Sequence, residues 1–206
     1  MFIVSIISLI GFLVFLGSVK FISRHDSNNF EVSRKSIIFM YIFAPVYLIY
    51  LKYGNSFSFS AYSILVIYLV IVGFIDYRSK NVYSIFNWVM YFIGSLSYII
   101  LIFLGYNSVE SLLYNILFIA FVKILGFLNM FGDGDVDILI VISLILGVTL
   151  GGIYSLVILL LLMIISNLVA LILNIRLFNF KKLIFKEEIA YAPSIAIATV
   201  FILLVS

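Results

Sequence analysis

The sequence predicts an all-α membrane protein built as a bundle of about eight transmembrane helices. Of its 206 residues, 66% are hydrophobic and 10% are charged, and the mean hydropathy is +1.33. Soluble domains are about 45–50% apolar and about 25% charged. Apolar runs such as residues 156–162 are continuous, whereas a transmembrane β-strand alternates apolar and polar residues. The apolar segments also recur at close to the roughly 20 residues that a helix needs to cross a bilayer.

Eight segments are long enough, or nearly long enough, to be spans. The residues suited to chemistry begin at Asp76. We therefore expect residues 57–206 to form a six-helix core and residues 1–56 to form an accessory transmembrane hairpin. The first span is not expected to be a cleaved signal peptide, because Lys20 and Arg24 follow its apolar stretch instead of preceding it. In chain order the predicted spans are 2–19, 37–51, 57–75, 85–104, 109–128, 136–150, 153–173 and 191–206.

The composition excludes several kinds of chemistry. There is no cysteine and one histidine, His25. A disulfide, a thiolate zinc site and a cysteine nucleophile are therefore excluded, and a histidine-rich metal site or a Ser-His-Asp triad is not expected. We predict no cofactor and no metal. The net charge of +3 gives no reason to expect a nucleic-acid partner, because the basic residues follow the membrane topology.

The distribution of lysine and arginine predicts the orientation. Basic residues favour the cytoplasmic side of short loops. With the N-terminus outside, 11 of the 12 basic residues lie inside, and only Lys52 lies outside. The inner residues are Lys20, Arg24, Arg34, Lys35, Arg78, Lys80, Lys123, Arg176, Lys181, Lys182 and Lys186.

Acidic residues gather at two points of this topology. Asp133, Asp135 and Asp137 fall within five residues of a chain that holds nine acids, although an acid at the centre of a membrane helix costs about 2.5–3.5 kcal/mol. They lie at the inner start of the sixth predicted helix, and Asp76 lies at the inner end of the third. Two facing carboxylates can share one proton, so that one is the acid and the other the base that activates water. Such a pair titrates as a unit and hydrolyses a peptide without a metal.

The glycines of Gly132-Asp133-Gly134-Asp135 suit a catalytic turn. Gly132 and Gly134 are expected to adopt backbone angles that other residues avoid and to let a substrate backbone approach. Asp135 would sit near a helix start, whose positive dipole end favours a carboxylate. Asp133 is expected to face water, although it is the nearest rival to Asp135.

Each acid also has a simpler interpretation. Asp76 could be a surface acid that ends a helix and pairs with Arg78. The Gly-Asp-Gly-Asp stretch could be a tight turn with a helix cap. Asp137 could assist Asp135 or be an ordinary first-turn residue.

These residues resemble the prepilin peptidase family, the membrane aspartic proteases that process type IV pilins and archaellins. The family has an Asp at the cytoplasmic end of a helix and then a short basic stretch, similar to 76–82 here. A Gly-x-Gly-Asp motif follows two helices later, similar to 132–135. A basic loop and a proline that opens the last helix are matched more loosely by 186–193. The resemblance spans about 57–206.

The resemblance implies a function. It implies an aspartic endopeptidase of the cell membrane, with multiple spans and its active site facing the cytoplasm. Its substrates would be membrane-inserted prepilin or preflagellin precursors, from which it would remove a short basic leader. Asp76 and Asp135 would be catalytic. Arg78, Lys80 and Asp137 are candidates for a supporting role around that pair. The chain has no cysteine-rich zinc insertion, which points to the archaeal-type branch that acts as a peptidase alone. Many relatives carry Lys where this chain has Asp137.

Two other functions stay open. A presenilin-like or signal-peptide-peptidase-like protease shares the Gly-x-Gly-Asp motif, but it usually has a Tyr-Asp pair and a Pro-Ala-Leu motif. Here Tyr77 follows Asp76, and no Pro-Ala-Leu is present. A proton-coupled or cation-coupled transporter would line a path across the bilayer with acids, whereas the sequence gathers them at one interface.

Overall fold

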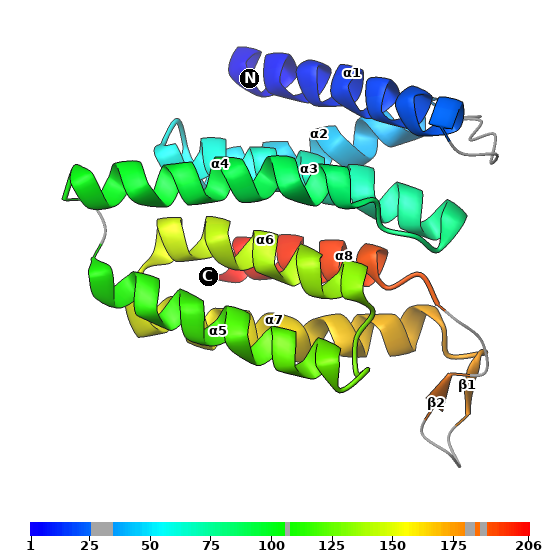
Figure 1. The fold of residues 1–206 in the computed structure, drawn as a ribbon. Coiled ribbons are helices and arrows are strands. Elements are labelled where there is room, and N and C mark those ends of the chain that lie inside the picture. The colour runs from blue at the N-terminus through cyan, green and yellow to red at the C-terminus, as the bar shows by residue number, and fades with distance from the viewer. Residues whose placement is uncertain (26–34, 106–107, 180–183, 186–188) are drawn as a thin grey trace. The chain divides into compact units, whose positions relative to one another are not determined.

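The computed structural model describes residues 1–25, 35–105, 108–179, 184–185 and 189–206, and in these residues the chain forms eight helices (Figure 1). Each predicted helix is present, and the first is longer than expected because it continues to His25. The helices are α1 Phe2–His25, α2 Lys35–Tyr53, α3 Phe57–Ser79, α4 Ser84–Phe103, α5 Val109–Phe127, α6 Asp133–Leu150, α7 Gly152–Leu173 and α8 Ala192–Val205.

A short strand pair lies between α7 and α8, where no strand was predicted. Phe178–Asn179 (β1) pairs antiparallel with Ile184–Phe185 (β2). Each strand has two residues, too few to leave a period-2 pattern that could be recognised in the sequence.

Among the described residues, six helices, α1 to α5 and α7, are long and apolar enough to cross a membrane. The described part of the chain is thus a multi-pass helical membrane protein by length and composition. The other two predicted spans fall short for different reasons. Helix α6 carries three acids in its first five residues, and α8 has 14 residues, a length of about 21 Å at 1.5 Å per residue.

The helices divide into two compact units. The first unit contains residues 1–81 and 169–206, and the second contains residues 82–168. Helices α1 and α2 pack on α3 within the first unit, so the 1–56 segment is not a separate compact unit. An accessory role for that hairpin in function stays a prediction.

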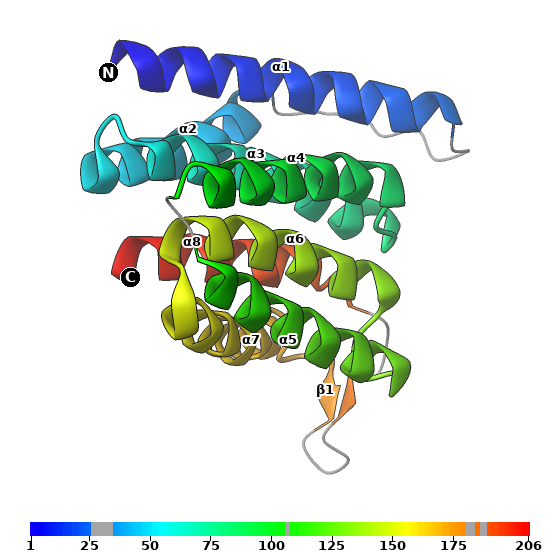
Figure 2. The same cartoon turned by 60° about the vertical axis from the view of Figure 1, so that its left-hand side comes forward.

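Helix α3 is the centre of the first unit. It packs against α1, α2 and α8, and 61% of its most apolar window is buried, against 33% or less in the other five candidate spans. The Phe15 and Phe74 rings meet edge to face at 5.1 Å, and Phe12 meets Phe39 at 5.7 Å. The chain direction, followed by colour in Figures 1 and 2, makes α1 antiparallel to α2 and parallel to α3.

Described basic residues lie at both ends of the first unit, and more of them lie at one end than at the other. Lys52, the basic residue predicted to lie alone outside, donates from Nζ to the carbonyls of Leu203 and Leu204 at 3.3 and 3.1 Å. It therefore caps the C-terminal end of α8, where carbonyls have no helical partner. At the other end lie Arg24 and Lys35, together with Arg78 and Lys80. Four further predicted inner residues, Arg34, Lys181, Lys182 and Lys186, lie outside the described residues.

Buried polar groups hold α6 to α5 in the second unit. The Asn115 side-chain amide donates to the Ser143 carbonyl at 3.0 Å, and the Ser111 hydroxyl donates to the Gly147 carbonyl at 3.2 Å. A Cβ added at Gly147 would lie 2.6 Å from the Asn115 amide nitrogen and would also strike the Tyr98 hydroxyl. The glycine thus lets the helices approach, as small residues do between membrane helices.

Candidate active site

Asp76 lies in the last turn of α3 and is buried, with 5% of its surface exposed. Its Oδ2 accepts a hydrogen bond from the backbone amide of Ala192 at 2.9 Å, and the Tyr191 amide also contributes. These amides belong to the start of α8, where the first N–H groups have no helical partner and favour an anion. The simpler interpretation of Asp76 as a surface acid is therefore wrong.

Local sequence explains how α8 reaches Asp76. Pro193 occupies the first turn of α8, a position that suits proline because its N–H would be unpaired there. Gly73 lies one turn before Asp76, and a Cβ added to it would already touch the Pro193 backbone at 3.5 Å. Lys80 then ends α3 in the left-handed region, with φ 54°, and its amide donates to the Asp76 carbonyl.

The neighbours of Asp76 at the end of α3 are exposed. The Arg78 guanidinium lies 5.9 Å from the centre of the Phe74 ring, so it contacts an aromatic face and is not the partner that was considered for Asp76. Lys80 is also exposed. Both residues are positioned at the surface, next to the buried acid.

Asp135 lies in the first turn of α6 and is half-buried. Its carboxylate lies close to Gly132, the residue that precedes the helix, because a Cβ added at Gly132 would come within 3.2 Å of Asp135 Oδ2. Asp133 is exposed, as expected. The structure thus distinguishes the two acids: Asp135 turns toward the motif, and Asp133 faces outward.

The expected backbone role of the two glycines is wrong. Gly132 has φ −66° and ψ 149°, and Gly134 is helical, so other residues could adopt either conformation. The requirement is space. A Cβ added at Gly134 would lie 2.5 Å from the Cβ of Val82, and one at Gly132 would press on Asp135.

Asp137 is paired with a basic residue. Lys123 of α5 places its Nζ 3.1 Å from Asp137 Oδ1. The Tyr91 hydroxyl of α4 donates to the Asp137 backbone carbonyl at 3.3 Å. Asp137 therefore links α6 to α4 and α5, which is a structural role that the sequence did not predict.

The site residues fall into two groups. In the first unit, Asp76 accepts a hydrogen bond from the start of α8. In the second unit, Gly132 lies close to Asp135, and Gly134 lies close to Val82. Sequence reasoning missed Ala192 and Val82. Pro193 offered a signal for Ala192, since it marks a helix start and therefore unpaired amides. Nothing local in the sequence marked Val82.

No protein-family model matches the chain, and no curated protein and no solved structure matches it either. The fold places the chain in the class of multi-pass helical membrane proteins.

Proposed function

We propose that this protein is a membrane aspartic endopeptidase in which Asp76 and Asp135 form the catalytic pair. It removes a short basic leader from precursors of the prepilin and preflagellin type at the cytoplasmic face of the cell membrane. The proposal combines the family resemblance with the surroundings of each acid.

The observation that carries the proposal is a short covalent link between the two acids' surroundings. Val82 follows Asp76 by six positions in the sequence, and Val82 packs against Gly134, the residue before Asp135. A chain extends by at most about 3.3–3.6 Å per residue. The chain between Asp76 and Val82 therefore spans at most about 22 Å, a connection that permits the proposed pairing of the two acids.

Each unit also carries its acid at one end together with basic residues. Asp76 lies at the end of the first unit that holds Arg24 and Lys35, and Lys52 lies at the opposite end. Asp135 lies near Lys123, which is paired with Asp137. Basic residues favour the cytoplasmic side, which supports the proposal that both acids face the cytoplasm.

The proposed chemistry needs only these acids and water. One carboxylate takes a proton from water, the resulting hydroxide attacks the scissile carbonyl, and the protonated partner supplies the proton that the leaving amine requires. The Ala192 amide fixes one oxygen of Asp76 during this exchange. Asp133, exposed beside Asp135, offers a negative contact to a basic leader.

The test is co-expression with a precursor that carries a basic leader before its apolar helix, followed by measurement of the shortened product. Asp76→Asn and Asp135→Asn should each abolish cleavage, while the matched change Asp137→Asn should leave most of it. Intact cleavage in both catalytic variants would overturn the proposal. A cut mapped deep inside the substrate helix would instead favour the presenilin-like alternative. Ion flux in liposomes that Asp135→Asn abolishes, without any proteolysis, would favour a transporter.

A further inference from the structure

An apolar groove of about 640 Å³ lies in the first unit, along α2, α3 and α8. Its walls include Pro45 of α2, Val66 and Val70 of α3, Ala196 of α8 and Phe15 of α1. All lining residues belong to this one compact unit. Among the described lining residues Arg78 alone is charged, and it lies at the end of the groove where α3 ends.

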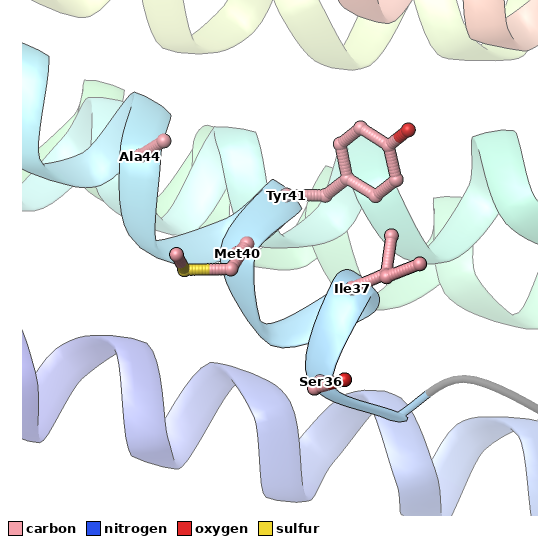
Figure 3. Close-up of a pocket in the computed structure, with 5 residues that line it drawn as sticks. All are labelled: Ser36, Ile37, Met40, Tyr41 and Ala44. Carbon is pink, nitrogen blue, oxygen red and sulfur yellow. The ribbon is translucent and has the colours of Figure 1, made fainter.

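A second hollow of about 400 Å³ adjoins the groove on α2 (Figure 3). Tyr41 lines both, and Figure 3 shows Tyr41 and Ile37 extending from the same side of α2. Ser36 lies at the start of this hollow, next to the exposed Lys35. The two hollows therefore share Tyr41. The groove has Arg78 at one end of the unit, and the second hollow has Lys35 next to it at the same end.

The groove is long and its walls are apolar, as the binding of a hydrocarbon chain requires. From Val66 to Arg78 it follows twelve residues of α3, or about 18 Å. An extended hydrocarbon chain of that length fits along this apolar wall.

The positive charge of Arg78 at the end of the groove favours a ligand with an anionic head group. A guanidinium binds phosphate oxygens with parallel hydrogen bonds and is well suited to a site near the interface. Basic pockets between membrane helices on the cytoplasmic side bind anionic lipid head groups. We propose that this groove is a binding site for an anionic phospholipid, with an acyl chain against Val70 and Ala196 and the phosphate at Arg78.

The site lies beside the contact that holds Asp76. Gly73 and Pro193 both line the groove, and Ala192, next to Pro193, donates to Asp76. A bound lipid would therefore brace α8 against α3 and raise the stability of the first unit. Lipid binding does not require the peptidase proposal, so either can fail without the other.

The experiment is a lipid titration of the purified full chain in an uncharged detergent, followed by native mass spectrometry. Phosphatidylglycerol and phosphatidylcholine with the same acyl chains are compared. Because one basic residue near the interface contributes about 1 kcal/mol, phosphatidylglycerol should bind about fivefold more tightly. Arg78→Gln should remove that preference, and Arg78→Lys should retain most of it. The matched control is Arg24→Gln, an exposed arginine at the same end of the unit that does not line the groove.

A second variant tests the apolar wall. Ala196→Phe should fill the groove and weaken both lipids, while Ala120→Phe, at an exposed alanine of α5, should weaken neither. Each variant is first checked for an unchanged helical circular dichroism spectrum. Equal affinity for the two lipids, equal losses in Arg78→Gln and Arg24→Gln, or unchanged binding in Ala196→Phe would each overturn the proposal. So would a dimer of this chain that Ala196→Phe dissociates while lipid binding persists.

Discussion

The backbone amide of Ala192 donates a hydrogen bond of 2.9 Å to Oδ2 of Asp76, a residue 116 positions earlier in the chain. The bond joins the end of α3 to the start of α8 and is buried. It gives Asp76 a fixed orientation, and it gives the unpaired first amides of α8 an acceptor.

This bond predicts a difference between two substitutions of Asp76. Asparagine keeps an oxygen for the Ala192 amide, whereas leucine leaves that buried N–H without an acceptor. A buried unsatisfied donor costs about 1–3 kcal/mol, so Asp76→Leu should be less stable than Asp76→Asn by about that amount. Thermal unfolding in detergent checks it. Equal stability of the two variants would show that the bond contributes nothing.

The close contact of Gly134 with Val82 makes a second prediction. Gly134→Ala should destabilise the second unit by about 1–3 kcal/mol, the usual cost of overpacking, because its Cβ would lie 2.5 Å from the Val82 Cβ. Val82→Ala should give only partial relief, since alanine removes the Cγ atoms at 2.9 and 3.3 Å but keeps the Cβ at 2.5 Å, while Val82→Gly should restore much of the lost stability. A double-mutant cycle measures this coupling. Additive effects of Gly134→Ala and Val82→Gly would contradict the contact.

Gly132 predicts an effect on activity more than on stability. Its backbone suits an alanine, but the added Cβ would lie 3.2 Å from Asp135 Oδ2 and would displace the carboxylate by a few tenths of an ångström. Small displacements of a reacting group are costly, so Gly132→Ala should lower cleavage about tenfold with little change in unfolding temperature. Gly17→Ala is the control, because nothing lies within 4 Å of that position. Full activity in Gly132→Ala would count against Asp135 as a catalytic group.

The Lys123–Asp137 pair should be weak. The two side chains are 58% and 26% exposed, and exposed ion pairs contribute about 0.2–1 kcal/mol. A cycle of Lys123→Gln and Asp137→Asn should give a coupling in that range, reduced by salt. A coupling that high salt leaves unchanged would show that the interaction is not an exposed ion pair.

Lys52 predicts a stabilising cap. Lys52→Ala should cost about 0.3–1 kcal/mol, because the lysine satisfies carbonyls at the end of α8. Lys20→Ala, at an exposed position of α1, should cost less. The two unfolding temperatures in detergent are compared directly, and equal losses would contradict the cap.

The sequence by itself determined the class of protein and the helices. Runs of about 20 apolar residues leave few alternatives in a bilayer, because backbone groups must be satisfied within the segment, so the six long helices were predictable. Helices α6 and α8 were predicted from shorter apolar runs. The same reasoning located Asp76 at a helix end and Asp135 at a helix start, because both positions follow from where apolar runs stop.

Only the tertiary structure decided what those residues contact. The Ala192 amide on Asp76, the Lys123 partner of Asp137, the Lys52 cap on α8 and the fit of Val82 against Gly134 each join residues far apart in the chain. A period or a motif reports which face of a helix is apolar, but not which neighbour covers it. Gly132 and Gly134 show this most clearly. The sequence predicts unusual backbone angles for them, whereas the packing shows that a side chain at either position would crowd Asp135 or Val82.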